Sequence, residues 1–423
     1  MTVLPHPQTG REERLRATAA GRKQTGGSKP KIIALPGDLS ACGYYRVFAP
    51  LAAMERAGLA EVHRPEPTID EDGHVDVRIN TEDLKGFDIA VFQRQPEMRI
   101  LALFGHARRY GTKTVYDVDD DLFNVPPNSP AYLAYGRDWR RVGGLGKLVG
   151  RTYQEFPPVS DGRIILDPKR REYAALEHAA HEWTDQARAN CAGIIRNMRA
   201  ADLVTVSTER LREVYGAHRS DLVILRNQIE PRDWAGAIED PYPKPEQECW
   251  IGWAGTRTHY ADLKEIARAV VTVLQRNPNT RLVLAGFPEA RSLFQKVTAQ
   301  VVTFDWMPIT DYRRIVAAFD IALAPLDAIK FNEAKSDIRV LEAALCGVPV
   351  VASETTYGDT VRAGNCGLVA KTPQKWIGHL ERLVHNPDLR KQMGENGRKY
   401  VTRKRTYDAN AWRWAEAYAQ LMN

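Results

Sequence analysis

Short runs of β-branched and other apolar residues alternate with longer helical patterns along most of this chain. The first half contains KIIALPG, DIAVFQR, TKTVYDV, DLVTVS and LVILRN, and the second half contains WIGWAG, RLVLAG, VVTFDW, IALAPL, VPVVAS and GLVA. This alternation is typical of strand–helix–strand units, which build parallel sheets covered by helices. The sequence therefore predicts an α/β fold with one doubly wound domain in each half.

The length of 423 residues allows two domains with separate cores. Residues 227–248 are rich in proline and lack periodicity, which is the composition of a linker. The predicted parts are a disordered basic arm at 1–30, a first domain at 31–230, a linker at 231–248, a second domain at 249–405 and a terminal helix at 406–423.

The composition, with 43% hydrophobic and 26% charged residues, is that of a soluble globular protein. No apolar run approaches the roughly 20 residues that span a bilayer, and the N-terminus lacks the apolar core of a signal peptide. The five cysteines are scattered, without the spacing of a disulfide framework or a zinc site. We therefore expect a cytoplasmic protein.

Basic residues concentrate in the N-terminal arm and in residues 136–171, which belong to an insert at about 124–200. In the second segment they are interleaved with Trp139, Tyr153 and Phe156. Such a segment can bind nucleic acid, although a solvated loop face is the commoner explanation. Because long loops in compact domains are usually functional, we expect the insert to cap a ligand cleft.

The stretch FNEAKSDIRVLEAALCGVPVVAS, residues 331–353, predicts a helix with Ser336 as its N-cap and Cys346–Gly347 as its end. Free N–H groups at the helix start and Arg339 one turn inside could bind a diphosphate. Glu342 follows on nearly the same face and could accept both hydroxyls of a ribose. The alternative is a surface ion pair between Arg339 and Glu342.

The span SDIRVLEAALCGVPVVAS resembles the nucleotide-sugar motif of family-4-type glycosyltransferases with the GT-B architecture. IGWAGTRTHYADL and NCGLVAKTPQKWIGHLERLVHNPDLRKQMGENGRKYV resemble the first loop and the closing helices of the donor domain in that family. The resemblance implies two Rossmann-like domains facing a central cleft, with a nucleotide sugar, expected to be a UDP-sugar, on the second. It also implies that Arg339 contacts the diphosphate, that Glu342 contacts the ribose, and that the terminal helix crosses back to the first domain.

One position departs from the family pattern. Many members carry a further glutamate at the position of Ala334, and Glu333 lies one residue away from it. The sugar-contacting role of that glutamate therefore does not transfer simply to Glu333, and Lys335 or Ser336 can take its place. The identity of the sugar stays open.

A second loop of the predicted donor site follows the strand WIGWAG. Glycine at Gly255 lets backbone approach a phosphate closely, and the side chains after it can donate hydrogen bonds. Asp262 could orient the histidine of this loop. The alternative is an ordinary strand-to-helix turn with a surface histidine. The residues assigned to the donor here are Gly255, Thr256, Arg257 and His259.

In the first half, SACGYYRVFAPLAAM follows the first strand at the matching place. Gly43 permits a tight turn, and Arg46 is expected in the first turn of the next helix, facing the cleft; we assign both to donor binding. The segment resembles the Gly-Tyr-Tyr-Arg entry of glycosyltransferases encoded by bacteriophages and bacterial surface-glycan clusters. VYDVDDDLFNVPPNSPAY resembles the same group.

Four aspartates, Asp117, Asp119, Asp120 and Asp121, end a predicted strand in that second motif. Asp-Val-Asp is also the metal motif of the other large glycosyltransferase architecture. Because the predicted diphosphate site lies at residues 335–342, we expect no metal and place the aspartates on the acceptor side. The alternative is a loop N-cap cluster. The residues predicted to be catalytic are Asp119, Asp120, Asp121 and Arg94, and those predicted to bind the acceptor are Gln93, Arg140 and Arg141.

The resulting hypothesis is a metal-independent glycosyltransferase that uses a nucleotide-sugar donor. The acceptor could be a hydroxymethylated pyrimidine in phage DNA, a virion protein or a surface glycan. Two other functions stay open: a non-transferring GT-B enzyme such as a sugar-nucleotide epimerase, and a catalytically silent module that binds nucleotide sugars.

Overall fold

The computed structural model describes residues 29–69, 75–76, 79–126, 129, 131–136, 159–160, 163–164 and 172–422. The chain forms two compact units. The first consists of Met1–Asp119, Arg196–Arg232 and Val401–Asn423, and the second of Asp120–Ile195 and Asp233–Tyr400. No helix among the described residues is long and apolar enough to cross a membrane.

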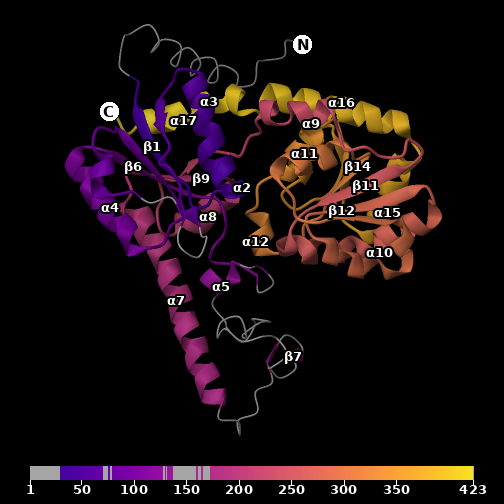
Figure 1. The fold of residues 1–423 in the computed structure, drawn as a ribbon, viewed down its shortest axis with the longest axis horizontal. Helices are drawn as coiled ribbons and strands as arrows, with labels where there is room; N and C mark the ends of the chain where they lie inside the picture. The colour runs from indigo at the N-terminus through magenta and orange to yellow at the C-terminus, as the bar shows by residue number, and fades with distance from the viewer. Residues whose placement is uncertain are drawn as a thin grey trace, which may run out of the picture. The chain divides into compact units, whose positions relative to one another are not determined.

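The first unit is built on a six-stranded parallel sheet (Figure 1). Its strands, in spatial order, are β10 (Val223–Ile224), β9 (Leu203–Val206), β6 (Lys113–Val118), β5 (Ile89–Gln93), β1 (Lys31–Leu35) and β2 (Glu61–His63). The helices of this unit are α2 (Ala41–Gly43), η1 (Tyr44–Phe48), α3 (Ala49–Arg56), η2 (Thr81–Leu84), α4 (Met98–Tyr110), α8 (Glu209–Gly216) and α17 (Tyr407–Ala419). A small antiparallel pair joins β3 (Thr68–Ile69) to β4 (Val75–Asp76).

The second unit contains another six-stranded parallel sheet. Its strands, in spatial order, are β13 (Val301–Phe304), β12 (Thr280–Ala285), β11 (Cys249–Ala254), β14 (Ile321–Ala324), β15 (Val350–Ser353) and β16 (Gly367–Ala370). Its helices are α9 (Ala235–Glu239), η6 (Arg257–His259), α10 (Tyr260–Arg276), η7 (Pro288–Gln300), α11 (Ile309–Ala317), α12 (Lys330–Glu333), α13 (Ile338–Leu345), α14 (Gly358–Gly364) and α15 (Pro373–Val384).

Six further elements lie at or near the unit boundaries or in the insert. They are α5 (Tyr132–Tyr135), the antiparallel pair β7 (Val159–Ser160) and β8 (Arg163–Ile164), the long helix α7 (Glu172–Ala200), and α16 (Pro387–Lys404), which precedes α17; a single helical turn, η5 (Pro231–Asp233), spans the linker boundary.

The core of the second unit shows why these residues form these elements. In α10 the buried residues Leu263, Ile266, Val270, Val273 and Leu274 recur at helical spacing, so one face of the helix is apolar. That face packs with α15 and η7 against the sheet, where β11 and β12 are almost completely buried. Strands that are covered by helices read as continuous apolar runs, which is the pattern seen in the sequence.

The strand order reverses once in each sheet. In the second unit the chain runs outward from β11 to β12 and β13, then returns to β14 on the other side of β11 and continues to β15 and β16. In the first unit the reversal lies between β1 and β5. Open α/β sheets bind ligands at such a switch point, beyond the carboxyl ends of the two strands. The loops that begin at Gly255 and Pro325 therefore occupy the position expected of a binding site.

The α/β prediction with two doubly wound domains is confirmed, because all eleven apolar runs form parallel strands. The short edge strand β2 has no matching prediction. The helix predicted to start after Ser336 instead starts at Ile338, with Asp337 as the N-cap residue. Its predicted end is confirmed: Cys346 is the C-cap and Gly347 follows with φ of 76°.

Candidate functional site

At the switch point of the second unit, Arg339 connects helix α13 to the end of strand β11. It lies in the first turn of α13, and its Nη1 donates a hydrogen bond to the carbonyl oxygen of Ala254, the last residue of β11. Gly255 follows directly. A Cβ atom there would lie 2.7 Å from the Trp253 ring, so a larger residue would not fit. The predicted donor residues Gly255 and Arg339 therefore lie close together.

A carboxylate network links the loop after β11 to the loop after β14. His259 Nδ1 lies 2.9 Å from Asp262 Oδ2. The other oxygen of Asp262 accepts hydrogen bonds from the Asp327 backbone N–H at 2.9 Å and from Asn332 Nδ2 at 2.8 Å. Asp262 is 4% exposed, so these hydrogen bonds lie in the interior of the unit. The network holds both loops in one arrangement.

The electrostatics of this network concern the predicted role of His259. Burial, together with the positive charges of Arg339 and Lys335, lowers the pKa of His259 to about 4. The imidazole is therefore neutral near pH 7, and a ring proton on Nδ1 would make the 2.9 Å contact with Asp262 Oδ2 a hydrogen bond. Its Nε2 then carries a lone pair, which accepts hydrogen bonds and repels phosphate oxygens. Donation from His259 to the diphosphate requires the proton on Nε2 instead, and the contact stays a prediction.

Glu342 lies on α13 one turn beyond Arg339 and is 6% exposed. Its Oε2 accepts a hydrogen bond of 2.8 Å from the hydroxyl of Tyr312 on α11. Since Arg339 donates to Ala254 and Glu342 is buried, a surface ion pair does not describe these two residues. The arrangement suits recognition of a ligand at the switch point.

Residues 333–336 lie between α12 and α13. Glu333 is exposed and Ala334 is 1% exposed, so neither takes up the position of a buried acidic ligand. Lys335 and Ser336 are half-buried, and Lys335 Nζ lies 4.3 Å from the centroid of the Phe331 ring. Thr256 and Thr258, in the loop after β11, share a hydrogen bond of 2.8 Å between their hydroxyls, and Arg257 is exposed beside them.

In the first unit, Arg46 is not a donor-binding residue. It is 2% exposed, and its guanidinium donates to both oxygens of Asp117, at 3.0 and 2.6 Å, and to Asn227 Oδ1 at 2.8 Å. A third acceptor is the Leu225 carbonyl oxygen, 2.5 Å away. All these partners come from distant parts of the chain, so the arginine is a buried structural residue.

The turn at Gly43 is as tight as predicted. A Cβ atom on Gly43 would lie 1.9 Å from the Asp38 carbonyl oxygen. The Asp38 carboxylate accepts hydrogen bonds from the Gly43 N–H at 3.2 Å and from the Ser40 N–H at 2.8 Å. Asp38 also pairs with Arg94 at 2.7 Å, which brings this turn to the switch point of the first sheet.

Arg94 and Asp119 meet at the end of β5 and β6, where they were predicted. Arg94 Nη1 lies 3.6 Å from Asp119 Oδ1, and the Arg94 backbone has φ of 40°, a conformation that non-glycine residues rarely adopt. Gln93, predicted to bind the acceptor, is fully buried, and its Oε1 accepts a hydrogen bond from the Gly37 N–H at 2.9 Å. That assignment is wrong for this structure because the side chain faces the interior.

The aspartates after β6 differ in exposure. The side chains of Asp119 and Asp120 are 8% and 19% exposed. Asp121 is fully buried. Its carboxylate stabilises the local turn by accepting hydrogen bonds from the Phe123 N–H at 3.1 Å and from Asn124 Nδ2 at 2.7 Å. Asp121 is therefore structural and not catalytic, as in the N-cap alternative. Arg140 and Arg141 lie outside the described residues.

Sequence reasoning did not identify Tyr312, Asn332, Asp327 and Asp38 as parts of these sites. Asp38 offered a signal, since it follows the first strand directly. Tyr312 offered none, because it lies within a helical pattern and its partner is 30 positions away.

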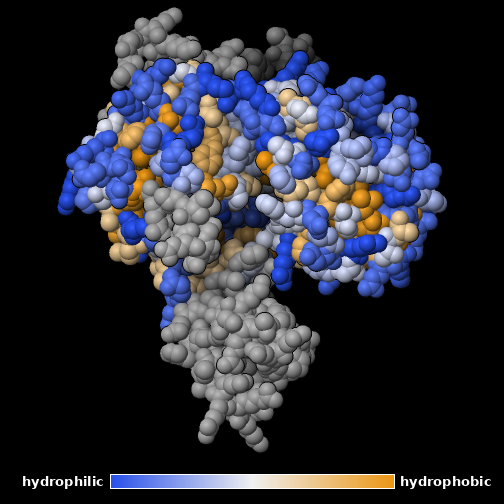
Figure 2. Space-filling model, viewed as in Figure 1, coloured by the Kyte–Doolittle hydropathy of each residue, from blue (hydrophilic) through white to orange (hydrophobic). Residues whose placement is uncertain are grey.

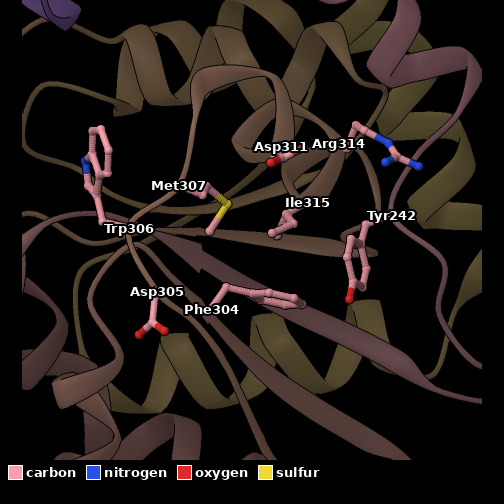
Figure 3. Close-up of a pocket in the computed structure, with 8 residues that line it drawn as sticks. All are labelled: Tyr242, Phe304, Asp305, Trp306, Met307, Asp311, Arg314 and Ile315. Carbon is pink, nitrogen blue, oxygen red and sulfur yellow. The ribbon is translucent and has the colours of Figure 1, made fainter.

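The second unit also contains an open hollow of about 360 Å³ beside β13 and α11 (Figure 3). Tyr242, Phe304, Trp306 and Met307 contribute apolar surface, and Trp306 is 78% exposed. The rings of Tyr242 and Phe304 lie 4.9 Å apart, edge to face. Elsewhere, the face of the molecule shown in Figure 2 is mostly hydrophilic, with smaller apolar patches.

Residues 248–386 match the model of the family described as Glycosyl transferases group 1. No curated protein matches this chain. Among solved structures, the chain is similar to sucrose-phosphate synthase from Thermosynechococcus elongatus, with 15% identity, a TM-score of 0.54 and coverage of 93% of this chain and 99% of that one.

Two further structures have a similar fold. One is WaaG, a glycosyltransferase involved in lipopolysaccharide biosynthesis, with 17% identity, a TM-score of 0.51 and coverage of 91% of this chain and 98% of that one. The other is Anabaena Alr3699/HepE in complex with UDP-glucose, with 12% identity, a TM-score of 0.58 and coverage of 92% and 99%. At these identities the likeness concerns the fold, which is GT-B, with two Rossmann-like domains.

Proposed function

We propose that this chain is a glycosyltransferase that moves a sugar from a nucleotide-sugar donor to a hydroxyl acceptor. The observation that carries the proposal is a buried glutamate, Glu342, one helical turn from Arg339 at the switch point of the second sheet. Both lie in the segment that matches the group 1 glycosyltransferases. The motifs further suggest a family-4, phage-type enzyme.

In this proposal the second unit binds the donor. The α13 N-terminus, Arg339 and Lys335 neutralise the diphosphate, and Glu342 accepts the ribose hydroxyls. Gly255 lets the backbone approach the phosphates, beside Thr256 and Arg257. A UDP-sugar is the favoured donor, since the similar Anabaena structure was solved with UDP-glucose.

Neutral His259 takes a different role from the cations around it. Its Nε2 lone pair suits a sugar hydroxyl, which can donate a hydrogen bond, better than a phosphate. Ser336, half-buried before α13, can contact the same sugar.

Transfer requires that the acceptor oxygen bond to the anomeric carbon while the bond from that carbon to the diphosphate oxygen breaks. The departing diphosphate carries negative charge, which Arg339 and Lys335 stabilise. Asp119 and Asp120 orient the acceptor hydroxyl and take up its proton. Arg94, which pairs with Asp38, lies beside Asp119. We propose that a hexose or pentose is transferred with retention and without a metal ion.

The direct test is turnover with a panel of labelled nucleotide sugars, each incubated alone and with candidate acceptors. A transferase labels an acceptor. An epimerase converts the donor without any acceptor, and a silent binding module leaves donor and acceptors unchanged. Activity should survive EDTA. Cys42 and Asp119 have potential ligand atoms within 4.8 Å of each other, so loss of activity with EDTA and rescue by manganese would reassign this region to metal binding.

Donor binding should depend on Glu342. Glu342→Ala should weaken nucleoside diphosphate binding by about 1.5–3 kcal/mol, the range for loss of a charged hydrogen-bond acceptor. Isothermal titration calorimetry with UDP measures the effect, with exposed Glu395→Ala on α16 as the matched control. Equal affinity of the folded Glu342→Ala variant and the wild type would remove Glu342 from the site.

The proposed acceptors are a hydroxymethylated pyrimidine in DNA, a virion protein and a surface glycan, and the enzyme would act in the cytoplasm. The basic segment 136–171 and the N-terminal arm support DNA, because their arginines and lysines could contact phosphates without regard to sequence. A flipped base would bring its hydroxyl to the enzyme.

Binding to duplex DNA across a salt series tests this acceptor. A DNA enzyme should show a steep fall of log affinity with log salt, and the slope should flatten when Arg140, Arg141, Lys147 and Arg151 are neutralised together. Absent or salt-independent binding would move the acceptor to protein or glycan.

A further inference from the structure

Helix α11 places a tyrosine hydroxyl directly on the carboxylate of the proposed donor site. Tyr312, in the first turn of α11, donates a hydrogen bond of 2.8 Å to Glu342 Oε2 on α13. The two helices pack against each other in the second unit. Since α13 also carries Arg339, the tyrosine fixes one of two oppositely charged groups on the same helix.

The hydroxyl keeps its proton. Burial and the negative charge of Glu342 raise the pKa of Tyr312 well above its ordinary value. A phenol that stays neutral donates to the carboxylate without cancelling its charge, whereas a lysine or arginine partner would cancel it. Tyr312 therefore gives Glu342 a hydrogen bond without placing a positive charge beside it.

The ring of Tyr312 packs against Trp234, which lies in the linker. Trp234 is fully buried, and its ring lies 6.3 Å from that of Tyr312, edge to face. Arg313 lies with its guanidinium 5.6 Å from the centroid of the Trp234 ring. Helix α9, which follows Trp234 directly, packs on α11. These contacts restrict the orientation from which the hydroxyl reaches Glu342.

From these contacts we infer that Tyr312 is a positioning residue that fixes the Glu342 carboxylate for ribose hydroxyls, and so makes the site selective for ribonucleoside over deoxyribonucleoside diphosphates. The inference rests on the proposed donor site. A carboxylate that is already oriented loses less conformational freedom when a ligand binds, so its hydrogen bonds contribute more to affinity. A ligand without ribose hydroxyls gains nothing from that orientation.

The experiment compares UDP with 2′,3′-dideoxy-UDP by isothermal titration calorimetry. The wild type should bind UDP at least about tenfold more tightly than the dideoxy ligand. Tyr312→Phe keeps the ring on Trp234 and removes only the hydroxyl. It should weaken UDP binding about fivefold and change dideoxy-UDP binding less than about twofold. The ratio of the two affinities is independent of the folded fraction, so partial unfolding does not mimic the effect.

A double-mutant cycle separates positioning from packing. In a Glu342→Gln background, Tyr312→Phe should have no further effect on the preference for UDP, because the carboxylate that it orients is gone. Tyr400→Phe, on α16 in the same unit, is the matched control and should leave the preference unchanged. A Tyr312→Phe variant that weakens both ligands equally, or keeps the full preference for UDP, would overturn the inference.

The outcomes also distinguish this inference from the proposed function. If wild-type protein binds neither UDP nor GDP nor ADP, the proposed donor site is wrong, and so is the role inferred for Tyr312. If UDP binds without any preference over the dideoxy ligand, Glu342 does not contact the ribose. If the preference exists and survives Tyr312→Phe, only the positioning role fails.

Discussion

At the scale of single residues, the polar groups of the candidate site are held by specific partners before any ligand binds. Asp262 receives hydrogen bonds from two different loops, and burial together with the charges of Arg339 and Lys335 leaves His259 neutral. Glu342 receives the Tyr312 hydroxyl. Such fixed groups need little rearrangement when charge develops during a reaction, which is the physical basis of electrostatic catalysis.

The His259 side chain should titrate far below an ordinary histidine. Its pKa is about 4 in the folded protein, against an ordinary histidine value of 6.5. Between these two pH values the unfolded chain binds a proton that the folded chain does not, so the free energy of unfolding falls as pH drops from about 6.5 to about 4. NMR titration of the histidine rings measures the pKa, and the signal absent from His259→Gln identifies the residue.

Removing a nearby positive charge provides the matched test. Arg339→Gln should raise the pKa of His259, because the Arg339 charge disfavours a second cation beside it. A value near 6.5 in the wild type, or no change in the variant, would show that the ring is solvated and that the assigned tautomer is wrong.

Residue types at strand ends could be predicted from the sequence, but their burial could not. Asp119 and Asp121 follow a predicted strand, and Arg339 and Arg46 lie in helices near strand ends, yet Arg46 and Asp121 are structural. The difference arises from partners far away in the chain: Arg46 binds Asp117, which is 71 positions away. A local pattern contains no information about such a partner, so a buried ion pair and a ligand site look alike.

At the scale of elements, the strands were predictable because both faces of each sheet are covered and their residues are therefore continuously apolar. The start of α13 was not predictable. Ser336 is a residue type that often caps helices, but Asp337 occupies the N-cap position. Asp337 Oδ2 accepts a hydrogen bond of 2.5 Å from the Thr360 hydroxyl on α14. The Asp337 carboxylate therefore binds α14, and it forms no capping hydrogen bond with its own helix.

The ends of β11 and β12 approach so closely that only glycine fits. Gly286 has φ of 92°, and a Cβ atom there would lie 2.9 Å from the Gly255 carbonyl oxygen. Gly286→Ala should therefore lower the free energy of unfolding of the second unit by about 1–3 kcal/mol. Urea denaturation followed by tryptophan fluorescence measures the change.

A glycine in an unstrained position serves as the control for this prediction. Gly378 lies within α15, and a Cβ atom there meets nothing within 4 Å. Gly378→Ala should be neutral or slightly stabilising, because alanine favours a helix. Equal stability of the Gly286→Ala variant and the wild type would mean that the two strand ends can separate without cost.

At the scale of the whole molecule, each unit combines distant parts of the chain. The first unit includes α17, the last helix, which packs on α3. Tyr407 at its start donates a hydrogen bond to the Tyr45 carbonyl oxygen, and Asp408 pairs with Arg56 at 2.8 Å. The chain therefore returns to its first unit after completing the second sheet.

Trp414 should be essential to the first unit. It is 1% exposed on α17, so Trp414→Ala should lower the free energy of unfolding of this unit by about 3–5 kcal/mol, through lost burial and the cavity left behind. UDP affinity should not change in protein that stays folded, since the proposed donor residues belong to the second unit. Half-buried Trp412→Ala is the control, and an equal loss in both variants would contradict the prediction.

This division of the chain affects the order of events during protein synthesis. Domains generally fold as units while the ribosome is still extending the chain, N-terminal ones first. Here the first unit lacks α17 until residues 401–423 have been made, whereas the second unit ends at Tyr400. The unit that contains the first strand to be translated is thus the last to be completed. Until then, the surface of α3 that α17 will cover is exposed to chaperones and to other nascent chains.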